Sequence, residues 1–339
     1  MPHRAGRSAG TRSARALVAG GVLTTLLAVA GLLAGLPAAS AAPVAGRPAA
    51  AATRPQTQSA RHARPVYYIA LGDSLAQGVQ PATPPLPPGV TLGQSIETNA
   101  GYANDLYAHY KRTFGRALRL VKLGCPGETT TSMLTGAGSP CGYPRGSQLA
   151  AALAFISAHR SQVKLITIDI GANDIDGCAT ATGISQSCVT TAFGAVTHNL
   201  PLIIGALRKA AGRNTAIAGM NLYDPFLAEY LSGPAGQQEA AASVGLDESF
   251  NRLLGRADRA FGVRTADVQD AFSTANSTST VPLPGVGTVP LNVARICEWT
   301  WMCAAPPVGP NIHANPTGYR HIAAAFERAI GHLGRPARA

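Results

Sequence analysis

Five short apolar runs alternate with segments of helical periodicity along most of the chain. The runs have the β-branched and aromatic content of buried strands and cover residues 66–71, 118–123, 163–170, 215–220 and 263–268. Between and after them, apolar residues recur at helical spacing in 102–114, 149–156, 189–211, 238–261 and 316–330. This alternation predicts an α/β domain over residues 65–333, with a mostly parallel five-stranded sheet covered by helices on both faces.

Two regions break the alternation of strands and helices, and Pro201 interrupts one of the predicted helices. Residues 81–89 contain too many prolines for a helix or a central strand and predict an exposed loop. Residues 273–309 are rich in Gly, Pro, Ser and Thr with little periodicity, so we expect a long irregular connection there. Pro201 stands inside the helical pattern of 189–211, which predicts a kink or a break.

Three of the predicted strands end in small polar turns. Ser74 follows the first strand, Gly127 follows the second, and Asn173 follows the third. The carboxyl ends of parallel strands meet at one edge of a sheet, where open α/β proteins build their sites. Hydrolytic acyl transfer needs a nucleophile, a base and donors for the oxyanion. Ser74 is the candidate nucleophile, and His313, in a loop just before the last helix, is the candidate base.

The N-terminal region has the features of a secretory signal. The net charge is +11, but residues 1–64 hold eight arginines and no acid, so only 20 basic and 17 acidic residues remain beyond them. Arginines precede an uncharged apolar stretch at 16–36 and the small residues at 39–41, which predicts a signal peptide over 1–41. An uncleaved membrane anchor through 16–36 is the alternative, because about 20 apolar residues can span a bilayer.

Composition predicts the nature of the segments that flank the domain and limits the partners that we expect. Residues 42–64 are rich in Ala, Pro, Arg and Thr without periodicity and predict a disordered linker, and 334–339 form a basic tail. Because the basic residues are not concentrated in the domain, we expect no nucleic-acid partner. We expect a monomer that acts on a small-molecule or lipid ester, with transient contact to a lipid surface left open.

Six cysteines in an exported chain predict a disulfide framework. They fall into pairs separated by 16, 10 and 6 positions, namely Cys125 with Cys141, Cys178 with Cys188, and Cys297 with Cys303. We expect these pairs to be bonded, although six cysteines formally allow about 15 connectivities. No cysteine or histidine spacing typical of zinc sites is present, so no metal is expected.

Four blocks in this order resemble the SGNH hydrolases, also called the GDSL lipase and esterase family. They are Gly72-Asp73-Ser74-Leu75, Gly127 within residues 125–129, Gly171-Ala172-Asn173-Asp174, and His313 followed by Pro316-Thr317-Gly318-Tyr319. The resemblance covers residues 66–330. It implies a flavodoxin-like three-layer α/β/α sandwich without a cofactor, Ser74 as nucleophile and His313 as base. It also implies an oxyanion hole formed by the amides of Ser74 and Gly127 and the side chain of Asn173.

The group behind His313 departs from the commonest family pattern. Many members carry an Asp two or three residues before the histidine, whereas this chain has Pro310 and Asn311. Some secreted members of actinobacterial type, which this chain also resembles in its three local cysteine pairs, use a main-chain carbonyl instead. We therefore expect a Ser–His dyad assisted by the Pro310 carbonyl or by Asn311, with Asp224 after the fourth strand as a reserve.

Several other residues have simpler expected roles. Asp73 and Asp174 are expected to hydrogen-bond their own turns. Trp299 and Trp301 could wall an acyl pocket or pack in the core. Three further histidines, His109, His198 and His321, are expected to be ordinary helix residues.

The expected activity is esterase or lipase chemistry. Carbohydrate O-deacetylase and phospholipase or lysophospholipase activities are alternatives on the same fold, since they differ in loops. A catalytically inactive module that binds a cell surface is the alternative from another class.

Overall fold

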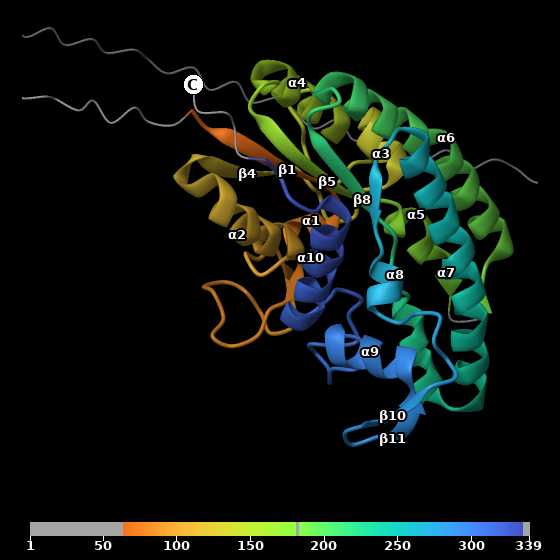
Figure 1. Ribbon diagram of the computed structural model, residues 1–339. Helices are drawn as coiled ribbons and strands as arrows, with labels where there is room; N and C mark the ends of the chain where they lie inside the picture. Colours follow the sequence, from red (N-terminus) through yellow and green to blue (C-terminus); the bar gives the residue numbers. More distant parts are fainter. Residues whose placement is uncertain (1–63, 181–182, 335–339) are drawn as a thin grey trace, which may run out of the picture. The chain divides into compact units, whose positions relative to one another are not determined.

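Five parallel strands form the central sheet, in the order β4-β1-β5-β8-β9 (Figure 1). They are β1 Val66–Gly72, β4 Leu118–Lys122, β5 Val163–Asp169, β8 Ala216–Met220 and β9 Arg264–Ala266. Ile69 in the middle of β1 pairs with Val121 on one side and with Ile166 on the other. All five predicted strands are confirmed, within a few residues at their ends. The strand order reverses between β1 and β5, which is where flavodoxin-like sheets bind ligands.

Helices cover both faces of the sheet, as the pattern predicts. On one face lie α2 Tyr102–Phe114 and α10 Pro316–Ile330, which contact each other; on the other lie α3 Thr130–Thr135, α4 Gln148–His159, α6 Gln186–Ala211 and α7 Pro234–Ala260 (Figure 1). Tyr102 of α2 stacks on Phe326 of α10 with ring centroids 4.9 Å apart. The three-layer α/β/α sandwich is therefore confirmed.

The computed structural model describes residues 64–180 and 183–334. The predicted signal peptide, and the predicted linker and basic tail apart from Arg64 and Gly334, lie outside the described residues. Within them the connections carry short elements. These are α1 Ser74–Gln77, β2 Gln80–Pro81, β3 Ser95–Ile96, η1 Gly115–Ala117, α5 Ala172–Ile175, η2 Asp176–Cys178, β6 Ala179–Thr180, β7 Gly183–Ile184, η3 Pro225–Ser232 and α8 Val268–Ala271.

The longest apolar helix runs unbroken through its proline. Helix α6 includes Pro201 and continues to Ala211, so a break at this position is the wrong expectation. Its buried face, with Val196, Leu200 and Ile203, packs into the core. Among the described helices, α6 alone is long and apolar enough to cross a membrane. Its contacts with α3, α4 and α7 make it a helix of this domain.

The region expected to be irregular contains regular structure. Strands β10 Thr280–Leu283 and β11 Gly287–Pro290 form an antiparallel hairpin, and α9 Leu291–Trp299 follows directly. Leu283 and Val289 face Val293 in a small separate core, which compensates for the prolines in both strands. The expectation of a long unstructured connection was wrong, because the apolar residues that order it are few and distributed over three short elements.

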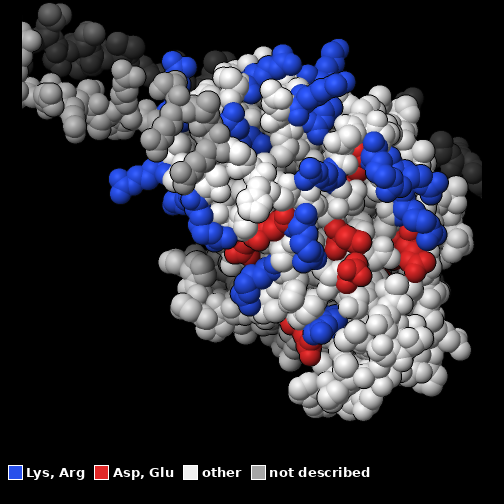
Figure 2. Space-filling view, viewed as in Figure 1, with Lys and Arg blue, Asp and Glu red and all other residues white. Residues whose placement is uncertain are grey.

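Charges are unevenly distributed over the visible surface. Lys and Arg are scattered over the face drawn in Figure 2 and do not form a stripe. The lobe around β10 and β11 is uncharged in that view, in agreement with the absence of Asp, Glu, Lys and Arg from residues 271–294.

We expect Gly72→Ala to destabilise the fold strongly. Gly72 has φ +132°, and a Cβ built there would overlap the main-chain oxygen of Asp169 on the neighbouring strand. Strain and overlap together predict a loss of about 3 kcal/mol or more in unfolding free energy. Gly89→Ala is the matched control, since Gly89 also has positive φ but open space around it, so a loss of about 1–2 kcal/mol is expected. Urea unfolding of both variants measures the difference; equal losses would contradict the close-approach argument.

Candidate active site

Ser74 is the first residue of a one-turn helix at the end of β1. Asp73 caps this helix by accepting a hydrogen bond from the Leu75 amide at 2.9 Å, which confirms its expected local role. The turn is closed at Gly78, whose amide bonds back to the Leu75 carbonyl. The sharp strand-to-helix turn therefore presents the Ser74 side chain at the carboxyl edge of the sheet.

A buried carboxylate, Asp169, supports from the neighbouring strand the turn that holds Ser74. We call this turn, residues 73–78, the nucleophile turn after the role predicted for Ser74. Its Oδ2 accepts hydrogen bonds from the amides of Asp73 at 3.3 Å and Ala76 at 3.1 Å, and the Tyr102 hydroxyl donates to its Oδ1. Burial, followed by the nearby Asp73 carboxyl, holds the pKa of Asp169 well above its usual range. Burial likewise raises the pKa of Asp73 to about 6.

Asp169 is a residue of the site that the sequence pattern did not indicate. A possible signal was present, because an acid that ends the most apolar strand must have buried partners. Its effect here is to connect β5, β1 and α2 beneath the candidate nucleophile.

Three groups are predicted to donate hydrogen bonds to an oxyanion, namely the main-chain amides of Ser74 and Gly127 and the side chain of Asn173. In the described part of the chain, no hydrogen bond is formed by the main-chain N–H of Ser74 or of Gly127, so both remain available to a ligand. Gly127 has φ +83°, the left-handed conformation that glycine adopts readily. The Asn173 side chain donates to the Glu128 carbonyl at 3.0 Å, which places its amide beside the Gly127 loop. The structure thus places Asn173 beside the Gly127 loop, and Ser74 and Asn173 line one pocket that Gly127 does not line.

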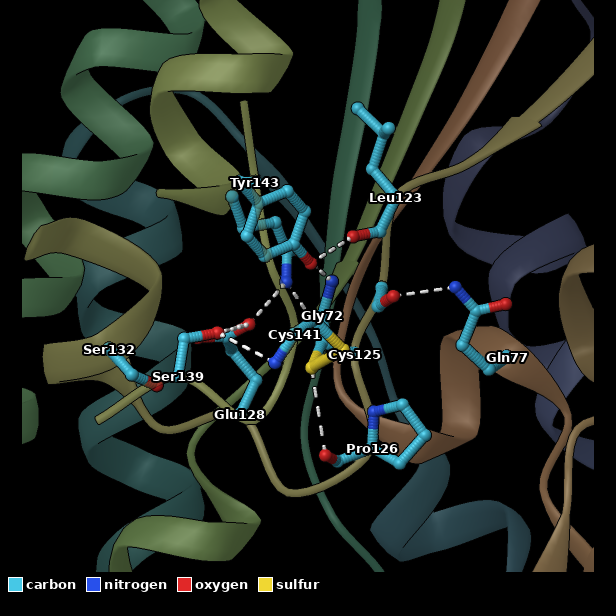
Figure 3. The surroundings of a disulfide bond; sticks show 12 residues. Gly72, Gln77, Leu123, Cys125, Pro126, Glu128, Ser132, Ser139, Cys141 and Tyr143 are labelled. Carbon is cyan, nitrogen blue, oxygen red and sulfur yellow. Dashed lines mark hydrogen bonds between the residues drawn. A yellow bond between two sulfur atoms is a disulfide. The ribbon is translucent and has the colours of Figure 1, made fainter. Parts of the chain in front are cut away.

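The loop that carries Gly127 is fixed on several sides (Figure 3). Cys125 is disulfide-bonded to Cys141, and the Tyr143 hydroxyl donates to the Leu123 carbonyl at 2.7 Å. Gln148 at the start of α4 clamps the Gly72 peptide, accepting from its N–H at 2.7 Å and donating to its carbonyl at 2.8 Å. The same amide of Gln148 donates to Glu128 at 3.2 Å. The nucleophile turn and the Gly127 loop are therefore held by one side chain.

Asp174 does not bond its own turn, contrary to expectation. Its carboxylate accepts from the Thr130 amide at 2.8 Å and from the Thr130 hydroxyl at 2.7 Å, at the N-terminus of α3. Asn199 of α6 donates to the same hydroxyl at 3.2 Å. The free amides of a helix start attract a carboxylate more than a local turn does. Asp174 therefore fixes the Asn173 segment against the neighbouring helix.

His313 is oriented by the side chain of Asn311. The Asn311 Oδ1 accepts from the His313 main-chain amide at 3.0 Å and lies 2.7 Å from His313 Nδ1. Because this oxygen can only accept, the proton of the neutral imidazole is assigned to Nδ1, which leaves Nε2 as an acceptor. Of the two candidates, the structure brings the Asn311 side chain to the ring and records no contact from the Pro310 carbonyl.

Main-chain hydrogen bonds hold the histidine loop in place. The Trp301 amide donates to the His313 carbonyl at 3.1 Å, and the Asn311 amide donates to the Trp301 carbonyl at 3.2 Å. The Tyr223 hydroxyl donates to the Ile312 carbonyl at 2.7 Å. Asn315 caps α10 by accepting from the amides of Thr317 and Gly318. The segment around Trp301 thus supports His313 through its backbone.

One pocket contains both candidate catalytic side chains. It is lined by residues from the nucleophile turn, α5 and η2, β7, the segment after β8, α7 and the histidine loop. Ser74, Asn173 and His313 are among them, and Leu222, Phe226 and Phe250 form apolar walls. His313 Nε2 is buried without a hydrogen-bond partner. Among the described residues, His313 Nε2 forms no hydrogen bond with the Ser74 hydroxyl, as is common before substrate binds.

Contacts decide between the alternatives left open for Trp299 and for Asp224. Neither Trp299 nor Trp301 lines the pocket. Trp299 packs edge-on to Phe272 and stacks on His321, so the core-packing alternative holds for it. Asp224 lines the pocket, but its carboxylate accepts from the Phe226 amide and the Ser243 hydroxyl, so it does not orient His313.

The remaining histidines and cysteines lie as expected. His109, His198 and His321 belong to α2, α6 and α10, and His109 pairs with Glu327 at 2.9 Å. The structure contains all three predicted disulfides. Within residues 64–180 and 183–334, no group of three His, Cys, Asp or Glu side chains is arranged to hold a metal ion.

We expect the His313 imidazole to stay neutral at pH values well below 6.5, the usual pKa of histidine. Burial lowers its pKa from 6.5 to about 4. The folded protein thus binds this proton less readily than the unfolded chain, and the stability contributed by the neutral ring is lost as the pH falls from about 6.5 to about 4. Nitrogen NMR of labelled protein measures the titration, with His313→Gln assigning the signal. A midpoint near 6.5 would contradict this account.

Several proteins of known structure have folds similar to that of this chain. Solved structures with similar folds include a lipase from a goat rumen metagenome (18% identity, TM-score 0.46, covering 80% of this chain and 99% of that one) and an extracellular lipase from Streptomyces rimosus (17%, 0.48, 78% and 99%). An acetylxylan esterase from Geobacillus stearothermophilus is also similar (14%, 0.44, 81% and 98%). No curated protein sequence matches the chain. The family model for GDSL-like lipases and acylhydrolases matches residues 70–321, and the chain therefore belongs to this family.

Proposed function

We propose that this protein is a carboxylic ester hydrolase that works through an acyl-enzyme at Ser74. The observation that carries the proposal is the state of His313. Its Nδ1 is fixed by Asn311, and its buried Nε2 has no partner in the pocket that also contains Ser74. A buried acceptor without a donor is costly unless a proton is delivered to it during function. Family membership supports ester hydrolysis as the reaction class.

The proposed reaction has two steps. The Ser74 hydroxyl attacks the ester carbonyl while its proton passes to His313 Nε2, and the alcohol leaves with that proton. Water then attacks the acyl-enzyme by the same route in reverse. The amides of Ser74 and Gly127 and the Asn173 side chain would stabilise the oxyanion in both steps. Each such donor is typically worth about 10²–10³ in turnover.

A neutral residue behind the histidine changes the energetics of the reaction. Asn311 fixes the tautomer but adds no negative charge to stabilise the imidazolium, unlike the Asp of a full triad. The low pKa of His313, about 4, fits this arrangement, because burial is not offset by a carboxylate. We infer an enzyme that keeps its base unprotonated in acid, with a less stabilised imidazolium intermediate.

The volume of the pocket favours a small substrate group over a long acyl chain. Its volume of about 120 Å³ is close to that of a cavity that holds benzene, about 150 Å³. Carbohydrate O-deacetylase and phospholipase activities have no separate observation in their favour. The well-formed donor set and histidine argue against an inactive binding module.

Export of the protein fits the same proposal. Three disulfides are typical of proteins folded in oxidising compartments. The predicted signal peptide over residues 1–41 would direct the chain there, and the protein would act as a monomer.

Labelling of Ser74 is the first test of the proposed function. We expect a serine-reactive fluorophosphonate to modify the folded protein once and Ser74→Ala to remain unlabelled, as read by intact mass. Ser139→Ala is the matched control, because its hydroxyl faces Glu128 away from the pocket, and it should be labelled normally. Absence of labelling in the folded wild-type protein would refute the enzyme proposal.

Substitution of Asn311 tests the orienting group. Asn311→Ala removes the acceptor from Nδ1, and a lost hydrogen bond of this kind predicts a fall in kcat of about 10–100-fold. Asn311→Asp keeps the acceptor and adds a charge, which raises the pKa of His313 and moves the acid limb of the kcat/KM profile upward from about pH 4. Steady-state kinetics with p-nitrophenyl butyrate measures both effects. If neither variant differs from wild type, the side chain has no such role.

A further inference from the structure

The substrate pocket is unusually rich in carboxyl groups for an apolar site. Besides the nucleophile turn, its lining residues contribute five acids, namely Asp176, Asp224, Glu229, Glu239 and Asp247. None of the described residues that line it is Lys or Arg. The salt bridges in the described part of the chain involve other residues, so no cation of the protein neutralises this group.

Two acids in this group accept no hydrogen bond from a described residue, namely the exposed Glu239 and the more buried Asp176. Asp224 bonds to the Ser243 hydroxyl at 2.6 Å, and Asp247 accepts from Asn251 at 2.9 Å. By contrast, no residue with a described side chain donates a hydrogen bond to the Asp176 carboxyl. Burial, with added repulsion from Asp73 and Asp224, raises the pKa of Asp176 to about 7. Asp176 is only partly buried and lines this apolar pocket, so a bound ligand can reach its carboxyl and supply the missing partner.

Aromatic rings face the same space. Phe226, Phe250 and Tyr223 line the pocket together with the acids. Aromatic faces combined with carboxylates are the chemistry that recognises organic ammonium groups, because the ring quadrupole and the anion both attract a weakly hydrated cation. An anionic substrate group would instead be repelled, as would a free carboxylate product.

We propose that the pocket is a binding site for an organic ammonium group, with Asp176 as its principal anion, so that the enzyme prefers small esters carrying a quaternary ammonium over their uncharged isosteres. This proposal rests on the ester hydrolase function above. It adds a substrate class that family membership does not specify. Asp73, Asp224 and Tyr223 interact electrostatically with Asp176, and the other titratable residues that line the pocket are Glu229, Glu239, Asp247 and His313.

The test compares two esters of the same shape and different charge. Butyrylcholine and 3,3-dimethylbutyl butyrate differ only in a quaternary nitrogen against a quaternary carbon. At pH 8 we expect kcat/KM to be about tenfold higher for butyrylcholine. The ratio should fall as the pH is lowered through about 7, since Asp176 becomes protonated while His313 stays neutral. A ratio of about three or less at pH 8 overturns the proposal.

Two variants assign the effect to the pocket. Asp176→Asn should bring the ratio down to about one and remove its dependence on pH. Asp270→Asn, on the exposed surface of α8 outside the pocket, should keep the wild-type ratio. A high ratio that survives in Asp176→Asn overturns the role of this residue. Hydrolysis of the neutral ester is measured in every case, so loss of ammonium preference is distinguishable from failure of the ester hydrolase proposal.

Discussion

The buried carboxylate of Asp169 is the interaction on which the site depends. It lies at the end of the central strand β5 and accepts hydrogen bonds from two main-chain amides of the turn that holds Ser74. The hydroxyl of Tyr102, from helix α2, donates a third hydrogen bond to it. The strand β1 must pass close to it, which only glycine allows at position 72. The position of Ser74, the sheet register and the helix packing are thus coupled through one side chain. Burying this acid costs free energy, and the hydrogen bonds that it accepts from the turn offset that cost while they fix the geometry of the turn.

The framework of the protein could be predicted from its sequence because it rests on local periodicity. The strands of the sheet and helices α2 and α10 follow directly from the spacing of apolar residues, and α2 and α10 agree to the residue. The candidate site residues Ser74, Asn173 and His313 could be placed because each ends a strand or precedes a helix. The cysteine pairs could be assigned because each closes a short loop.

The remaining features depend on contacts between distant segments. Asp174 bonds to α3 rather than to its own turn, and whether Asn311 or the Pro310 carbonyl reaches His313 is decided by the three-dimensional course of the loop pinned to Trp301. The hairpin β10–β11 draws its order from a four-residue core shared with α9. None of these has a periodic signal. The acids of the pocket likewise come from separate segments, namely the turn before α1, η2, η3 with its N-cap, and α7, and their convergence cannot be detected in the composition of a basic chain.

The three disulfides have a consequence for how the protein is prepared. None of them lies in the sheet: Cys125–Cys141 closes the loop of Gly127, Cys178–Cys188 joins η2 to α6 beside the pocket, and Cys297–Cys303 joins α9 to the segment before His313. The disulfides therefore cross-link segments around the candidate site and leave the central sheet without a covalent link. Their reduction would release these segments first, so the oxidation state of a preparation has to be established before its activity is interpreted.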